Sequence, residues 1–189
     1  MPEQTSQSKS PHGLPLLLTE RLRLVPYGLA PATVEAFCRV TTDPAIYWWR
    51  ETPYTEQQQT DYFESGALFE DAPRGLGAWA AFARDEDVQL GHVMLQPLDD
   101  AGMIEIGWHL LETARGHGYA TEAAAALFAY GFDVLNIDPI YAVILPANET
   151  SIQVAKRIGM QPDGEGTYHD DHHLRFRLTR TSHDTQLQD

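Results

Sequence analysis

One segment constrains the fold of this chain more than any other: residues 113–127, with the sequence TARGHGYATEAAAAL. It follows an apolar segment typical of a strand and leads into an alanine-rich helix predicted over residues 120–135. Gly116 and Gly118 carry no side chains into the turn, so backbone N–H groups can approach a ligand closely. The first amides of a helix lack internal partners and carry the positive end of its dipole, and Arg115 and His117 add local positive character. The segment therefore predicts an anion site suited to a pyrophosphate.

The glycine pair also has other interpretations. Two glycines before a helix can be turn chemistry alone, so the pair by itself leaves a structural role open. A Walker nucleotide loop requires a lysine after its last glycine, and this segment contains none. A dinucleotide-binding fingerprint requires a third glycine and an early β-α-β unit, which the sequence also lacks.

The order of the other elements predicts an α+β sandwich built around one sheet. Strands are predicted at residues 16–25, 78–83, 90–98, 103–111 and 139–145, and on both sides of a turn at residues 168–173. Further helices are predicted at residues 31–40, 55–70 and 150–158, with Thr55 as an N-cap and Gly159 as a C-terminal cap. The polar ends predict flexible tails at residues 1–15 and 182–189, on either side of a single domain over residues 16–181.

Composition narrows the partners and the compartment. The chain has 189 residues, and 27 Asp and Glu against 13 Lys and Arg give a formal net charge of −14. Binding to nucleic acid or to an anionic membrane requires a basic surface, so we expect neither, whereas an amine-bearing partner is compatible. We expect a cytoplasmic protein, because no apolar run could span a membrane and the first residues lack the apolar core of a signal peptide. The single cysteine, Cys38, excludes an internal disulfide and a cysteine-based zinc site.

Several segments together resemble a known family. RGHGYA at residues 115–120 resembles the R-x-x-G-x-G/A motif of the GNAT acetyltransferase superfamily. EIGWHL at residues 105–110 is similar to the strand beside the pantetheine arm, and ILPANETSIQVAKRIGM at residues 144–160 is similar to the N-x-x-S-x-x-V-x-x-K-x-G-F segment of the RimJ/RimL branch. LLLTERLRLVP and TTDPAIYWWRETPYT look like that branch's N-terminal strand and acceptor-side loop. The resemblance covers about residues 16–180.

This resemblance implies a GNAT fold, with a mixed, mostly antiparallel sheet of about seven strands and helices on both faces. It also implies transfer of the acetyl group of acetyl-CoA to a primary amine, either a protein N-terminus or a small molecule, with no metal required. Acetyl-CoA is expected to contact Ile106, Gly107, Trp108, Arg115, Gly116, His117, Gly118, Tyr119, Ala120, Thr121, Asn148 and Ser151.

The reaction requires a base, because an alkylamine with a pKa of about 10.4 must lose a proton before it attacks a thioester. Glu105 is the preferred base, since the resemblance places a catalytic glutamate there in part of the family; a solvated carboxylate at a strand end is the alternative. Strand alternation places Glu105, Gly107 and His109 on one face. His109 is the second candidate base by its intrinsic pKa, although a strand histidine is more often only hydrogen-bonded.

The predicted helix at residues 150–158 supplies the remaining chemistry. Asn148 is expected to bind the pantetheine amide, to cap the helix, or to do both. Ser151 is expected to donate a proton to the departing sulfur, or else to bond the backbone. It is assigned this role because the proton-donating aromatic of many family members would fall at Ala155. The same departure supports an alternative function, a non-catalytic acyl-CoA-binding module.

Two further clusters stand out in the sequence. Trp48, Trp49 and Tyr54 lie in the loop that the resemblance places beside the acceptor channel, so we expect them to bind substrate; capping of the core is the alternative. An apolar edge or this aromatic loop is compatible with a homodimer. Residues 169–173, HDDHH, offer possible metal ligands, but we expect them in the final hairpin turn and assign no metal to them.

Overall fold

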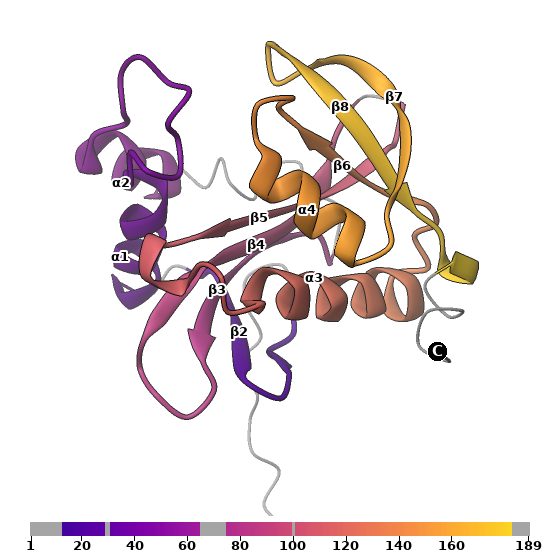
Figure 1. Ribbon diagram of the computed structural model, residues 1–189. Coiled ribbons are helices and arrows are strands. Elements are labelled where there is room, and N and C mark those ends of the chain that lie inside the picture. Colours follow the sequence, from indigo (N-terminus) through magenta and orange to yellow (C-terminus); the bar gives the residue numbers. More distant parts are fainter. Residues whose placement is uncertain (1–12, 29–30, 65–74, 100, 183–189) are drawn as a thin grey trace, which may run out of the picture.

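A computed structural model of the chain describes residues 13–28, 31–64, 75–99 and 101–182 (Figure 1). One eight-stranded sheet has the order β1-β2-β3-β4-β5-β6-β8-β7. The strands are β1 Leu17–Leu18, β2 Leu22–Pro26, β3 Gly77–Ala83, β4 Gln89–Pro97, β5 Ile104–Leu110, β6 Ile140–Ile144, β7 Gln161–Tyr168 and β8 Asp171–Leu178. The α-helices are α1 Pro31–Thr41, α2 Glu56–Glu64, α3 Tyr119–Ala129 and α4 Glu149–Arg157. A 3₁₀ turn, η1, spans Glu112–Ala114, and a π-helical turn, η2, spans Tyr130–Val134.

This architecture confirms the predicted α+β sandwich with a mixed, mostly antiparallel sheet. The sheet has eight strands where about seven were expected, because the segment predicted as one strand over residues 16–25 folds back on itself. The backbone N–H of Thr19 donates to the carbonyl of Leu22 at 2.9 Å, and Leu17 pairs with Leu24. The predicted helix over residues 120–135 is α3 followed by the π-helical turn η2.

Helices cover both faces of the sheet, and strand alternation separates the two cores. On one face, Phe37 of α1 and Phe63 of α2 pack with Ala78 and Ala80 of β3 in a small cluster around Tyr27. The main core on the other face joins α3 and α4 to the alternate strand residues. Its members include Trp79, Ala81, Val93, Leu95 and Ile106 of the strands and Ala123, Leu127 and Ala155 of the two helices. Alternate residues of one strand therefore face either the α1–α2 side or the α3–α4 side.

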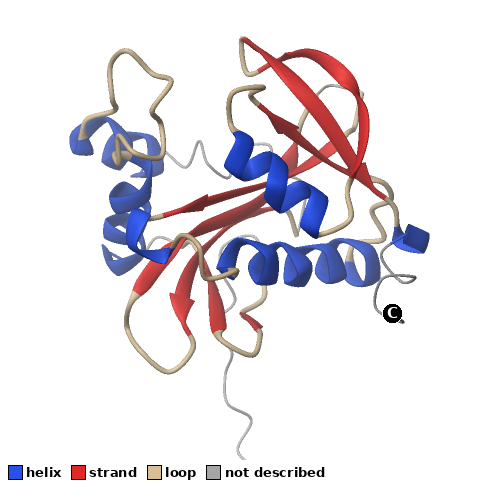
Figure 2. Ribbon diagram, in the orientation of Figure 1, coloured by secondary structure: helices blue, strands red, loops and turns tan. Residues whose placement is uncertain are grey.

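The sheet is discontinuous in the middle. The only parallel neighbours among the strands of the described chain, β5 and β6, share a single registered pair, Glu105 opposite Tyr141. Antiparallel pairing is extensive on either side, from β2 to β5 and from β6 through β8 to β7. Figure 2 shows these two groups of strands diverging from one another. Beyond Glu105, the edge of β5 that faces β6 is therefore not used for sheet pairing.

Local caps fix where the helices begin and end. Thr55 and Gln58 form the expected capping box: the Gln58 N–H donates to Thr55 Oγ1 at 3.2 Å, and the Thr55 N–H donates to Gln58 Oε1 at 2.8 Å. The helix that this box opens is described as far as Glu64, and the rest of the predicted segment lies outside the described residues. Gly159, with a φ of 81°, ends α4 as expected, because its N–H bonds the carbonyl of Lys156 at 3.1 Å.

The folded part begins before residue 16. Leu14 is buried in the main core, and the indole N–H of Trp79 donates to the carbonyl of Pro15 at 2.8 Å. Most of the two predicted tails, residues 1–12 and 183–189, lies outside the part of the chain that the structure describes. Within the described part, none of the helices has the length and apolar character needed to cross a membrane.

A close backbone approach at Gly91 generates a stability prediction. A Cβ atom at Gly91 would lie 2.1 Å from the backbone carbonyl oxygen of His109, so Gly91→Ala must push β4 away from β5. We expect a loss of about 2 kcal/mol in the free energy of unfolding, measured by urea denaturation. Gly102→Ala is the control for backbone strain without a clash, because Gly102 has a φ of 87° and its added Cβ meets no atom within 4 Å, so we expect a smaller loss there. An equal loss in both variants would show that this approach does not constrain the sheet.

Candidate active site

A cleft of about 970 Å³ opens where β5 and β6 separate. Its floor comes from residues 105–109 of β5, residues 142–144 of β6 and the following Leu145. The loop between α1 and α2 forms one wall, and the turn between β7 and β8 contributes residues at another. Asn148 and Ser151, at the beginning of α4, also line the cleft. The cleft is thus bounded by the edges of two strands, the beginning of α4 and two loops.

Glu105 lies where the two strands are still paired, and its residue is only 5% exposed. Gln96 Nε2 donates to Glu105 Oε1 at 2.6 Å, and His169 Nε2 lies 2.9 Å from the same oxygen. The structure therefore contradicts the alternative of a solvated carboxylate at a strand end. Buried carboxylates require such partners, because desolvation of an unpaired charge is costly. The arrangement keeps an acidic group at the closed end of the cleft.

His109 belongs to a chain of buried polar groups on the same face of the sheet. His109 Nδ1 shares a hydrogen bond of 2.8 Å with His92 Nε2, and His92 Nδ1 lies 3.4 Å from the hydroxyl of Tyr27. Burial lowers the pKa of His109 to about 4. Burial, and then the neighbouring His109, lower the pKa of His92 well below its usual value. Both imidazoles are therefore neutral at pH 7. The His109 side chain is hydrogen-bonded to His92, as the alternative to a catalytic role for His109 expected.

The start of α4 presents two expected residues to the cleft. Asn148 is the N-cap of α4, and its Oδ1 accepts the N–H of Ser151 at 3.1 Å. The capping role expected of Asn148 is therefore observed, and it also orients the first turn that carries Ser151. Ala155 is fully buried and packs in the main core with α3. An aromatic at that position would point into the core, so Ala155 does not remove a group from the cleft.

The glycine turn has the geometry expected of an anion site. Gly116 and Gly118 have φ values of 80° and 81°, in the left-handed region that favours glycine. No hydrogen bond within the described chain uses the backbone N–H groups of residues 116–121, which include the first turn of α3. The loop stands apart from the residues that line the cleft floor, after the end of β5 and the turn η1.

Arg115, also expected at this site, is engaged elsewhere. Its Nε donates to the carbonyl of Leu110 at 3.1 Å, and its Nη2 donates to the carbonyl of Ala45 at 3.0 Å. The guanidinium therefore links the end of β5 to the loop between α1 and α2. Arg115 therefore holds the α1–α2 loop, which forms one wall of the cleft, against the end of β5.

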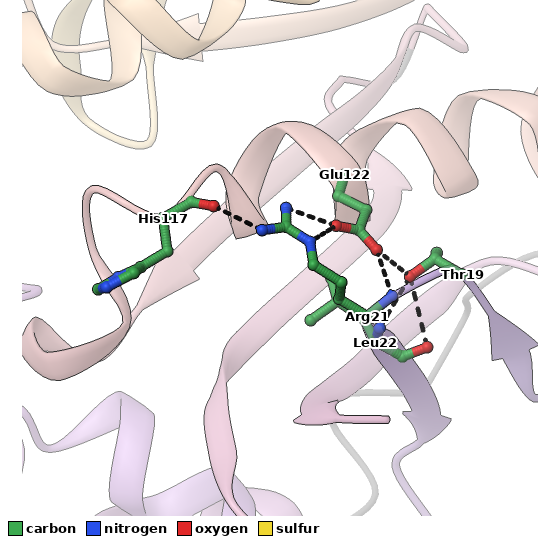
Figure 3. A network of polar contacts seen from close by, with 5 residues as sticks. All are labelled: Thr19, Arg21, Leu22, His117 and Glu122. Atoms are coloured by element: carbon green, nitrogen blue, oxygen red, sulfur yellow. Dashed lines mark hydrogen bonds and ion pairs between the residues drawn. The ribbon is translucent and has the colours of Figure 1, made fainter. Parts of the chain in front are cut away.

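A second arginine supports the glycine turn from the other side (Figure 3). Arg21 Nη1 donates to the carbonyl of His117 at 3.0 Å, and Arg21 Nε donates to Glu122 Oε2 at 2.7 Å. Thr19 Oγ1 donates to Glu122 Oε1 at 2.5 Å, and the Arg21 guanidinium lies 4.8 Å from the centre of the Tyr119 ring. Burial raises the pKa of the Glu122 carboxyl, but the hydrogen bonds from Thr19 and Arg21 together lower it by more, so this pKa lies below its usual value. The turn between β1 and β2 thus fixes the loop at the start of α3.

The aromatic loop divides into an inner and an outer part. Trp49 and Tyr54 line the cleft as expected, together with Tyr47, whose ring centre lies 5.4 Å from that of His109. Trp48 does not line the cleft; it packs edge-on against Trp49 and is 51% exposed. Burial raises the pKa of the Tyr47 hydroxyl to about 12, so this ring is uncharged at neutral pH.

Sequence reasoning missed several residues of this cleft. His92, Gln96 and Tyr47 received no role, and His169 was assigned only to a hairpin turn, although all four line the cleft. The residues on β4 could have been found from the hairpin register, which pairs position 92 with 109 and position 96 with 105. The histidines of the final hairpin do not gather around a common point: across the described residues, no group of three potential ligands could hold a metal ion.

The neutral histidines generate a prediction on pH and stability. Unfolding restores an ordinary histidine pKa of about 6.5, so the unfolded chain binds a proton more readily than the folded one. The folded pKa of His109 of about 4 then implies a loss of about 3 kcal/mol of stability as the pH falls from 6.5 through 4. Urea denaturation at several pH values should show a smaller loss in His109→Gln, and a loss equal to wild type in the exposed control His172→Gln. The same pH dependence in wild type and His109→Gln would contradict this account.

Known proteins match most of the described chain. Residues 21–161 match the family model "Acetyltransferase (GNAT) domain". The uncharacterized N-acetyltransferase p20 of Bacillus licheniformis is 30% identical over 154 residues, which are 78% of this chain and 83% of that protein. The chain spans about half the length of the first curated relatives that it matches.

Solved structures agree with this assignment. An acetyltransferase from Agrobacterium tumefaciens has a TM-score of 0.71 at 30% identity, over 88% of this chain and 95% of that one. The spermidine N-acetyltransferase of Vibrio cholerae, solved with CoA and spermine, has a TM-score of 0.71 at 14% identity, over 87% of this chain and 99% of that one, which shows likeness of fold alone. The fold, the separated β5 and β6 and these matches establish that the chain belongs to the GNAT acetyltransferase family.

Proposed function

We propose that this protein is an N-acetyltransferase that moves the acetyl group of acetyl-CoA directly to a primary amine within a ternary complex. The observation that carries the proposal is the buried Glu105 carboxylate at the closed end of the cleft between β5 and β6. A carboxylate is an acceptor for the proton that an ammonium must lose before it can act as a nucleophile. Family membership alone would leave open whether the chain retains a group for this step.

The proposed cofactor site extends along β5. The free amides of residues 116–121 would hold the pyrophosphate, because backbone N–H groups at a helix start favour anions. The pantetheine arm would then lie along the unpaired edge of residues 106–108, with Asn148 and Ser151 on its other side. The CoA complex of the Vibrio cholerae spermidine N-acetyltransferase supports CoA as the ligand of this fold.

The proposed chemistry has four coordinated parts. Glu105 accepts a proton from the amine, and the amine nitrogen then forms a bond with the thioester carbonyl carbon. Backbone N–H groups on the free edge of β5 stabilise the oxyanion that develops. The carbon–sulfur bond breaks and CoA leaves as a thiolate, which is a good leaving group because a thiol pKa is about 8.5. Ser151 is the proposed proton donor to that sulfur.

The acceptor has two proposed classes. The segment at residues 144–160 supports the RimJ/RimL-like branch, and with it a protein N-terminus as the acceptor. A small amine is the rival, and the spermine bound by the Vibrio cholerae structure supports it. Activity on peptides beginning with alanine or serine, compared with activity on polyamines, separates the two classes. Trp49, which is 36% exposed, and the half-buried Tyr54 line the cleft and would contact either acceptor.

The activity is tested by release of free CoA thiol from acetyl-CoA with a panel of peptides and small amines. For any amine that is acetylated, Glu105→Gln should lower kcat by about 100-fold, because general-base assistance is typically worth that much or more. The Kd for acetyl-CoA should not change. Glu165→Gln is the matched control, because Glu165 is exposed and lies outside the cleft. Full activity in Glu105→Gln would remove Glu105 from the mechanism.

The cofactor site is tested separately by calorimetry. Gly118→Val adds a side chain at a left-handed position of the glycine turn and should weaken acetyl-CoA binding by more than tenfold, about 1.4 kcal/mol. Gly102→Val is the control, because Gly102 also has a positive φ but lies in a turn away from the site. Unchanged affinity in Gly118→Val would place the pyrophosphate elsewhere.

A further inference from the structure

The turn between β7 and β8 contains two residues in an unusual backbone conformation. His169 and Asp170 have φ values of 50° and 67°, which define a tight hairpin turn with both central residues left-handed. Such turns favour asparagine and glycine, and histidine is among the few other residues that adopt this conformation with some frequency. The turn therefore accommodates a histidine at position 169 without requiring one, and non-glycine residues in this conformation cluster at functional sites.

The His169 side chain reaches from this turn to the buried carboxylate of β5. His169 Nε2 lies 2.9 Å from Glu105 Oε1, although the two residues are 64 positions apart in the chain. Gln96 Nε2 donates to the same oxygen at 2.6 Å. Two donors on two different elements thus converge on one atom of the carboxylate.

The second oxygen, Glu105 Oε2, is left for the cleft. No hydrogen bond in the described part of the chain involves it. The buried side-chain atoms without a partner in that part are Gln89 Oε1 and Thr121 Oγ1, so Glu105 Oε2 is not enclosed. Because Glu105 lines the cleft, this oxygen is the one that an incoming amine can meet.

His169 also interacts electrostatically with Glu105. The titratable groups of the hairpin that line the cleft or interact with His169 are Asp170, Asp171, His173 and His169 itself, and β6 presents Tyr141 beside Glu105. His169 is the one that makes an ion-pair contact with Glu105 among the described residues. The hydrogen bond to Glu105 raises the pKa of His169 above its usual value, against the opposing effect of burial. The contact therefore couples the protonation of His169 to the presence of the Glu105 carboxylate.

We propose that His169 is a positioning residue for acetyl transfer, which holds one oxygen of Glu105 so that the other oxygen receives the proton of the acceptor amine. The inference rests on the proposed function and deepens it by adding the β7–β8 turn to the active site. The proton moves from the ammonium to Glu105 Oε2 and then to solvent, while His169 keeps its own proton. No other reactant is required.

The test compares three variants of the full chain. His169→Asn suits the left-handed turn but is too short to reach Glu105, so it removes the contact while it preserves the hairpin. His169→Gln restores an amide donor of greater length. His172→Asn is the matched control on the same hairpin, because His172 lies 3.7 Å from Glu165 and does not line the cleft.

We expect His169→Asn to lower kcat at least tenfold with the KM for acetyl-CoA unchanged, because the Glu105 carboxylate loses one of the two donors that hold it. His169→Gln should recover part of kcat, and His172→Asn should match wild type. In NMR titrations, the raised pKa of His169 should return toward about 6.5 in Glu105→Gln.

Three results overturn the inference, and they can be distinguished. If wild type acetylates an amine and His169→Asn retains full kcat, then His169 does not position Glu105, and the proposed function stands. If wild type acetylates no amine of the panel, the proposed function fails and this inference fails with it. A pKa of His169 that is the same in wild type and Glu105→Gln would show that the contact is absent in solution, and would also overturn it.

Discussion

The separation of β5 from β6 is the constraint on which the rest of this structure depends. A parallel pair normally continues along both strands, yet here one registered pair, Glu105 opposite Tyr141, is followed by divergence. The free edge of β5 must find other partners or face a ligand, because exposed backbone donors and acceptors are costly to bury unpaired. The cleft between the strands therefore results from the sheet itself and needs no lid or second domain.

Distant segments hold this opening in place. On one side, Arg21 links the β1–β2 turn to His117 and Glu122, so the glycine loop is fixed from the opposite edge of the sheet. On the other side, Arg115 ties the carbonyl of Ala45, in the α1–α2 loop, to the end of β5. Each guanidinium bonds two groups, which sets an orientation as well as a distance. Backbone amides remain available at the glycine loop because these side chains, and not the amides themselves, anchor it.

The sequence predicted the features that depend on near neighbours. Thr55 with Gln58, Gly116 with Gly118, Asn148 and Gly159 each act within a few residues, so their spacing alone indicates a cap or a turn. Contacts set by strand register or by a returning hairpin could not be predicted in this way, because a shift of one residue reverses every side chain. Strand register sets the contacts of His92 with His109 and of Gln96 with Glu105. The returning β7–β8 hairpin sets the contact of His169 with Glu105. The contact of Arg115 with the carbonyl of Ala45 could not be predicted from spacing either, because the two residues are 70 positions apart.

Net charge proves to be a poor guide to the chemistry of the cleft. A formal charge of −14 is compatible with an amine-bearing partner, yet the acidic residues of the described chain are mostly on its surface. Inside the cleft, burial keeps His92 and His109 neutral, and the Glu105 carboxyl is held by Gln96 and His169. In the proposed reaction, an acceptor amine would therefore meet a buried carboxyl group among neutral imidazoles and aromatic rings such as Tyr47. Transfer of its proton to Glu105 would relieve the cost of a desolvated positive charge, so the same burial that opposes binding of the ammonium would favour its conversion to the nucleophile.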